Sequence, residues 1–210
     1  VHLKRQLTVQ DFRLEAPGAG RVKAHVIGII ENQAPTRHLV YELPVVNGEV
    51  VGDMASDIAK IAVVERHQGT GRVQVGLVHG FGFNVPCAIA TTVAHDSHHL
   101  IVVGTREIDM ALAANKLAHV GGGQVVVRDG EVIGLVELPI AGLMSSERAE
   151  VVARKAQSVL EGFRACGCTL NNPNMQLSLL ALVVIPELRI SDLGLVDVTK
   201  FVFIPVLEKI

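Results

Sequence analysis

Aromatic residues are scarce, because the chain has no Trp, one Tyr and six Phe among its 210 residues. The core must therefore be aliphatic, and side chains on which single-stranded nucleic acid stacks are few. An excess of charge of one sign is also missing: 19 Lys and Arg balance 21 Asp and Glu, for a formal net charge of -2. Without a basic stripe that follows phosphates, we expect no nucleic acid partner.

Cysteine and long apolar runs are equally sparse. The three cysteines, Cys87, Cys166 and Cys168, form no regular framework, which favours reduced thiols in a cytoplasmic protein. The apolar run Leu177–Ile185 is about half of the roughly 20 residues that a membrane span needs, so we expect no membrane association. No charged segment followed by an apolar one opens the chain, which begins at Val1 and is compatible with a piece of a longer polypeptide.

The order of apolar runs and turn residues predicts one compact domain. Residues 1–20 end in a Pro- and Gly-rich stretch and form a lead-in or linker, and residues 21–210 form the domain. Strand-like segments cover residues 21–30, 60–65, 72–79, 87–94, 99–104, 124–128 and 131–138. Asn47-Gly48 and Asp129-Gly130 are typical of tight hairpins.

Two segments have helical periodicity. One covers residues 106–120 and stops at Gly121–Gly123; the other covers residues 145–166, with Ser146 as its expected N-cap. Leu177–Ile185 is short and of undecided type. Strands outnumber helices and hairpins are frequent, so we expect an α+β fold, a largely antiparallel sheet covered by two or three helices.

The run Ala94–His99, AHDSHH, is the stretch whose residue types favour a chemical role over packing. It lies between two predicted strands, and Asp and Ser favour a turn, in which His95 and His98 can converge. In a continued strand, Asp96 and His98 would instead share one face, and His95 and His99 the other. Imidazoles beside a carboxylate suit a metal site or a general acid–base pair. The alternative is a solvated rim with Asp96 capping the backbone. Metal binding needs about three protein ligands, so further ligands have to come from elsewhere.

The best source of such ligands is the segment Glu65–Gly71, where a strand ends in charged residues and an imidazole before a glycine loop. It places Glu65 and His67 at a sheet edge, although an ordinary loop with an exposed histidine explains the same pattern. Glu187 follows an apolar segment where the chain changes direction, which also suits a plain turn. The Pro139–Ser145 loop suits a lid, an interface or a helix lead-in.

Several well-known catalytic patterns are absent. The chain has no nucleophile elbow, no His-Glu-x-x-His, no phosphate-binding Walker loop and no dinucleotide fingerprint. It also lacks the His-x-His pair, followed by distant His and Asp residues, that is typical of an amidohydrolase metal centre.

Taken in order, several segments resemble one family. They are Ile61–His67 (IAVVERH) with Gly69–Gly71, Gly76–Gly82 (GLVHGFG), Ala88–His98 (AIATTVAHDSH), Asp109–Ala113, Gly121–Gly123, Leu138–Ser145 (LPIAGLMS) and Val184–Leu188 (VIPEL). The chain is similar, from about Asp11 to Val198, to the C-terminal domain of bacterial adenine deaminases of the amidohydrolase type. His99 departs from the family pattern, in which Asn is common.

The resemblance implies hydrolysis of adenine to hypoxanthine and ammonia in purine salvage. Family members hold a divalent manganese or iron ion in a TIM barrel N-terminal to the region that resembles this chain, and metal-activated hydroxide attacks C6. The barrel and its principal metal ligands have no matching positions here, so we expect the metal ligands mostly outside this chain. The expected partners are adenine, the N-terminal barrel and further copies in a homo-oligomer.

Three hypotheses remain open. The chain is the domain that supports or closes a deaminase active site, a structural or oligomerisation domain with no part in the chemistry, or a self-sufficient metal-binding hydrolase. Under the first, this chain alone is inactive. The candidate residues are His95, Asp96 and His98 for catalysis, Glu65, His67, Ser97 and Glu187 for substrate binding, and His67, His95 and His98 for metal binding.

Overall fold

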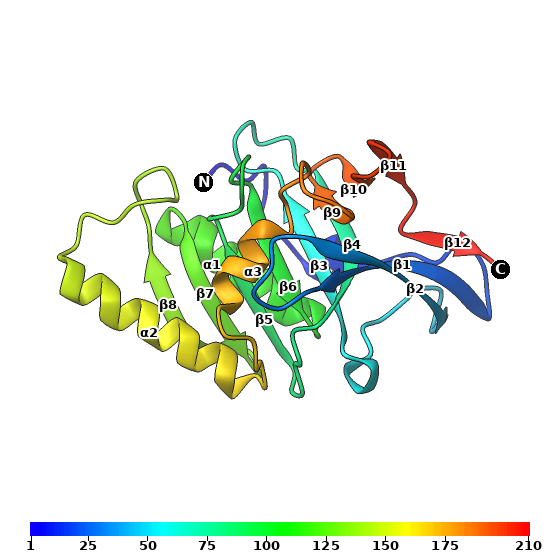
Figure 1. Cartoon of the computed structure of the whole chain (residues 1–210). Coiled ribbons are helices and arrows are strands. Elements are labelled where there is room, and N and C mark those ends of the chain that lie inside the picture. The colour runs from blue at the N-terminus through cyan, green and yellow to red at the C-terminus, as the bar shows by residue number, and fades with distance from the viewer.

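The structure, a computed structural model, describes residues 1–210 as a mixed α+β fold (Figure 1). The helices are α1 (Glu107–Val120), α2 (Ala149–Ala165) and α3 (Pro173–Leu179), with 3-10 turns at Val9–Phe12 and Met54–Ser56. The strands are β1 (Arg21–Ile29), β2 (Thr36–Pro44), β3 (Ile58–Val64), β4 (Val73–His79), β5 (Cys87–Thr91), β6 (Leu100–Gly104), β7 (Gly123–Arg128), β8 (Glu131–Glu137), β9 (Leu188–Ser191), β10 (Gly194–Asp197), β11 (Val202–Ile204) and β12 (Leu207–Lys209). None of the helices combines the length and apolar composition that crossing a membrane requires.

The strands form two sheets. The large, nine-stranded sheet has the order β12-β1-β4-β3-β6-β5-β7-β8, with β2 also paired to β1, and the small sheet has the order β11-β10-β9. Every pair is antiparallel except β1 with β4, where Val26 lies opposite Leu77 in parallel register. The prediction of a largely antiparallel sheet covered by two or three helices is confirmed.

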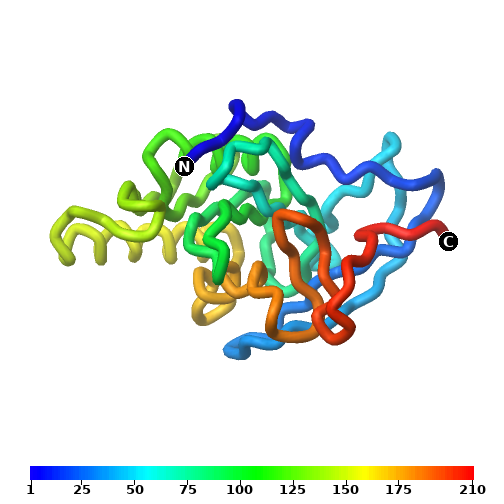
Figure 2. The backbone as a smooth tube through the Cα atoms, turned by 90° about the horizontal axis from the view of Figure 1, so that it is seen from above, coloured from blue at the N-terminus to red at the C-terminus, as the bar shows by residue number.

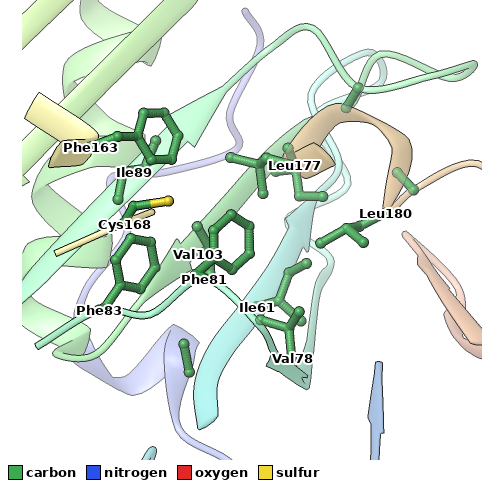
Figure 3. Packing of buried hydrophobic residues seen from close by; sticks show 14 of the residues in the cluster. Ile61, Val78, Phe81, Phe83, Ile89, Val103, Phe163, Cys168, Leu177 and Leu180 are labelled. Atoms are coloured by element: carbon green, nitrogen blue, oxygen red, sulfur yellow. The ribbon is translucent and has the colours of Figure 1, made fainter. Parts of the chain in front are cut away.

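Both faces of the large sheet are covered, which explains why its central strands are mostly apolar. In β3, Ile61 and Val63 face a cluster that includes α2, α3 and β9, whereas Ala62 and Val64 face α1. Figure 3 shows the first cluster, in which the rings of Phe81 and Phe83 stack with centroids 5.0 Å apart. On the α1 side, six of the fifteen buried residues are alanines, which lets the helix backbone lie close to the sheet.

The glycine signals marked helix and hairpin ends correctly. Helix α1 ends at Gly121, whose φ of 86° is left-handed, and Asp129-Gly130 joins β7 to β8. Asn47-Gly48 also forms a tight turn, but only the single bridge Val46–Glu49 closes it, and the expected flanking strands are absent.

The expected start of the second long helix is wrong. Helix α2 begins at Ala149 after Arg148, and no side chain caps it. Ser145 Oγ instead accepts a hydrogen bond from the amide of Glu147, and Ile140 pairs with Met144 in a local turn. The backbone therefore forms turns up to residue 148, and Arg148 takes the N-cap position of α2 that was expected for Ser146. The undecided stretch at 177–185 contains the end of α3 followed by turns.

We predict that Gly104→Ala destabilises the domain by about 1–3 kcal/mol, since overpacking a tight core forces backbone shifts. A Cβ at Gly104 would lie 2.7 Å from Cγ of Met110 and 2.8 Å from the carbonyl oxygen of Cys87. Urea unfolding measures the loss. The matched control is Gly18→Ala, where the nearest atom, on Lys209, is 3.9 Å away. Equal stability of the two variants would contradict the packing at α1.

Candidate functional site

Four segments that are distant in sequence meet at one edge of the large sheet. They are the first residues of the chain, the β3–β4 loop, the β5–β6 turn and the β8–α2 connection, all along the upper side of Figure 1. The amide of His2 donates to the carbonyl oxygen of Arg66 at 3.0 Å, so residues before β1 lie against the β3–β4 loop. We call His67 and residues 95–99 at this edge the histidine edge.

Arg66 joins these segments. Its buried side chain donates from Nε to the carbonyl oxygen of His98 at 2.6 Å and from Nη2 to that of Ala141 at 3.0 Å. Thr92 Oγ1 adds a hydrogen bond of 2.6 Å to the carbonyl oxygen of Gly142. The β5–β6 turn and the apolar connection after β8 are therefore held to the β3–β4 loop at fixed positions.

The predicted turn forms, and it brings His95 and His98 together. The amide of His98 donates to the carbonyl oxygen of Ala94 at 2.7 Å, and His98 adopts a left-handed φ of 51°. The two imidazole rings then lie edge to face with centroids 5.3 Å apart. Asp96 and Ser97 occupy the exposed tip of the turn.

The backbone determines the tautomer of His98. Its Nδ1 accepts a hydrogen bond from the amide of Ala94 at 3.2 Å, so the neutral ring carries its proton on Nε2. Burial lowers the pKa of His98, and the neighbouring His95 and Arg66 lower it further. At neutral pH His98 is therefore an uncharged hydrogen-bond donor through Nε2, and Nε2 has no lone pair to offer a metal.

His67 lies at the turn, as its place at a sheet edge led us to expect. Its Nε2 is 2.7 Å from the carbonyl oxygen of Ser97 and donates to it, and its ring lies 4.7 Å from that of His99. His99 Nε2 is 3.5 Å from Asp192, which also accepts a 2.7 Å hydrogen bond from Arg72. Burial lowers the pKa of His99, against the opposing effect of Asp192, so this ring is neutral as well.

Glu65 uses its carboxylate inside the β3–β4 loop. It accepts hydrogen bonds from the amides of His67, Gln68 and Thr70 and from the hydroxyl of Thr70. Burial alone would raise the pKa of Glu65, but these hydrogen bonds outweigh it and lower the pKa to about 2. The structure thus places this candidate substrate ligand as the anchor that shapes the loop carrying His67.

Glu187 lies apart from the histidine edge. Its Oε2 accepts a hydrogen bond of 2.7 Å from the amide of His38 on β2. Glu187 precedes β9 and Asp192 follows it, so the two ends of this strand are roughly 16 Å apart at 3.3 Å per residue. Of the candidate residues, the structure gathers His67, His95, Asp96, Ser97 and His98, and leaves Glu187 outside.

The three candidate metal ligands do not form a metal site among themselves. No group of three or more His, Cys, Asp and Glu side chains in the structure has an arrangement that holds a metal ion. His67 Nε2 and His98 Nδ1 are already bonded to the backbone. A manganese or iron ion therefore does not fit on the residues of this chain alone, and the histidine edge is an array of hydrogen-bonding groups.

Sequence reasoning passed over Arg66 and the pair of His99 and Asp192. Arg66 lies between the candidate residues Glu65 and His67, at the end of a largely apolar strand. The sequence does not reveal that its side chain is buried. Asp192 is 93 positions from His99, and only the packing of the β9–β10 hairpin beside the β3–β4 loop brings them together (Figure 2).

Comparison with known proteins agrees with the resemblance in the sequence. The model of a family described as the adenine deaminase C-terminal domain matches residues 33–202. Adenine deaminase 3 of Rhizobium meliloti (strain 1021) is 59% identical over 201 residues, covering 96% of this chain and 34% of its own length. Adenine deaminases of Ruegeria sp. (strain TM1040) and Moorella thermoacetica are 61% and 51% identical, covering 99% and 96% of the chain. The chain spans about a third of the length of these relatives.

We predict that Arg66→Met lowers the free energy of unfolding by about 1–3 kcal/mol, because the carbonyl oxygens of His98 and Ala141 lose a charged donor. Amide hydrogen exchange should accelerate at residues 94–99 and 138–145. The control is Arg72→Met, whose partly exposed ion pair with Asp192 contributes about 0–1 kcal/mol. Unchanged exchange in both segments would show that Arg66 does not hold them.

The pKa of Glu65 predicts a loss of stability in acid. Because that pKa is lower in the folded state than its ordinary value of 4.5, Glu65 contributes stability above pH 4.5 that is lost as the pH falls toward 2. The contribution is about 3 kcal/mol. Glu65→Gln should therefore be less stable at pH 7 and lose less than the parent between pH 5 and pH 3, measured by urea unfolding. Parallel curves for the two proteins would contradict the role of Glu65 as an anion.

Proposed function

The chain belongs to the family of adenine deaminase C-terminal domains, and we propose on this basis that it is part of an enzyme that hydrolyses adenine to hypoxanthine and ammonia. Water replaces the exocyclic amine of the purine at C6, and the amine leaves as ammonia. Such an enzyme serves purine salvage. Three free, buried cysteines support a reducing, cytoplasmic setting for it.

We assign the hydroxide-generating centre to the part of the enzyme outside this chain. The family resemblance implies a manganese or iron ion, and the histidines of this chain do not gather into a site for one. The relatives are about three times as long as the chain, which leaves room for a catalytic barrel. Accordingly, this domain contributes binding and positioning groups, and no metal-bound step is assigned to it.

The observation that carries the proposal is the convergence of the histidine edge beside the first residues of the chain. Where this domain is C-terminal in a longer protein, the preceding chain joins it next to His2, whose amide donates a hydrogen bond to the carbonyl oxygen of Arg66. Arg66 in turn holds the His95–His98 turn. The catalytic part of the enzyme is thus connected next to the turn, and the turn is suited to border the purine site.

The groups on the turn match the hydrogen-bonding pattern of a purine. The ring nitrogens of adenine accept hydrogen bonds, and the neutral Nε2–H of His98 is a donor that stays uncharged at neutral pH. The exocyclic amine donates, and the exposed carboxylate of Asp96 is an acceptor. His95 and the hydroxyl of Ser97 complete a set able to hold the substrate or the departing amine.

A structural or oligomerisation role is the second candidate, because large apolar side chains are exposed near the same edge, among them Leu193, Phe201 and Phe203. A self-sufficient metal-dependent hydrolase has less support, since the chain's own histidines form no site with three ligands. Activity of the chain by itself separates the third candidate from the first two: the first two predict none, and the third predicts turnover.

We predict that His95→Ala combined with His98→Ala, in the full-length deaminase, lowers kcat/KM for adenine by about 100-fold or more, within the range of a lost acid–base or positioning group. The measurement is ammonia release at saturating metal. The control is Glu187→Gln, at the far end of β9, which should stay within about twofold of the parent. Normal turnover in the double variant would place the turn outside the active site and favour the structural role.

A further inference from the structure

An apolar groove of about 490 Å³ opens directly beside the histidine edge, between the β5–β6 turn, the segment after α3 and the small sheet. Nine of its thirteen lining residues are hydrophobic, and Asp96 and Ser97 form part of its wall. Whatever fills the groove therefore also touches the exposed tip of the His95–His98 turn.

The walls of the groove expose large apolar side chains to solvent. Phe201 is 74% exposed, Val184 and Phe203 are each 60% exposed, and Leu193 is 56% exposed. Single exposed apolar residues are ordinary, but several around one concavity mark an interaction surface. Aromatic anchors in a pocket are also the residues that carry most of the binding energy at interfaces.

A second exposed apolar group lies at the other side of the same edge. Ile140, Leu143 and Met144 project from the β8–α2 connection, which Arg66 holds through the carbonyl oxygen of Ala141. The histidine edge is thus a polar strip with apolar side chains toward both ends. Covering both groups buries the strip between them, and one partner that spans the edge does this with a single contact.

We propose that this groove is the docking site for the part of the same deaminase polypeptide that precedes this domain. The inference rests on the proposed function only for the existence of that longer chain. In the relatives, about two-thirds of the protein lies outside the region that matches this chain. The first residues run beside Arg66 at this edge, so the preceding chain is tethered near the groove. A tethered partner has a high effective concentration and needs no strong intrinsic affinity.

The walls of the groove define the chemistry of the segment that fills it. Apolar side chains enter between Leu193 and Phe203, and a hydrogen-bond donor or cation faces the carboxylate of Asp96. Asp192, the other carboxylate of the wall, already accepts a hydrogen bond from Arg72, whereas Asp96 lies at the exposed tip of the turn. Docking of this kind removes water from the turn and seats the His95–His98 turn against the purine site.

Thiol labelling in the full-length deaminase tests the proposal. Leu193→Cys and Phe203→Cys place a thiol in the groove, and Ile108→Cys is the matched control, 57% exposed on α1 at the opposite face of the sheet. The native cysteines of this domain are buried, and the parent protein provides the blank for all others. With a maleimide under native conditions, we expect residues 193 and 203 to react at least about tenfold more slowly than residue 108, a protection typical of a buried interface.

The dependence on protein concentration identifies the occupant. Protection that is the same over a hundredfold dilution supports docking within one polypeptide, whereas protection that disappears on dilution assigns the groove to a second copy and overturns the proposal. Equal reactivity at 193, 203 and 108 also overturns it. Adenine turnover is assayed on the parent in parallel, so a protein that protects the groove but releases no ammonia refutes the proposed function and leaves the docking site standing.

Discussion

The candidate site depends on one buried cation, the guanidinium of Arg66. Burial lowers the pKa of Arg66, which reflects the cost of taking this charge out of water. Carbonyl oxygens of His98 and Ala141 accept its hydrogen bonds, and each belongs to a different loop. Each loop must present its carbonyl oxygen at a fixed position for the charge to be satisfied, so the buried charge fixes the positions of both loops.

The sheet makes such a site possible by supplying rigid strand ends. Since both faces of the large sheet are packed, β3, β5 and β6 are buried along their whole length, and their loops begin from fixed points. Alanines on one side let α1 approach closely, and larger side chains on the other side receive α2, α3 and the small sheet. The polar loops at the strand ends are therefore displayed on a framework with little freedom to move.

The backbone also determines what the histidines can do. Hydrogen bonds from the amide of Ala94 and to the carbonyl oxygen of Ser97 commit one ring nitrogen of His98 and one of His67. With those nitrogens engaged, the cluster is suited to donate and accept hydrogen bonds, and it lacks the three convergent lone pairs that a metal needs. The edge is therefore an array of hydrogen-bond donors and acceptors.

Local patterns in the sequence determined the fold class, most strand positions, the end of α1 at Gly121 and the turn at His95–His98, because these depend on residues that are neighbours in the chain. The start of α2 was not determined in this way, since Ala141 and Gly142, in the turns that precede the helix, are held by Arg66 and Thr92 from the loops that follow β3 and β5. Only tertiary packing decided that Arg66 is buried, that Glu187 lies elsewhere and that Asp192 reaches His99. Sequence patterns report periodicity and turn preference, whereas the partners of a buried charge are set by which strand ends the sheet brings together.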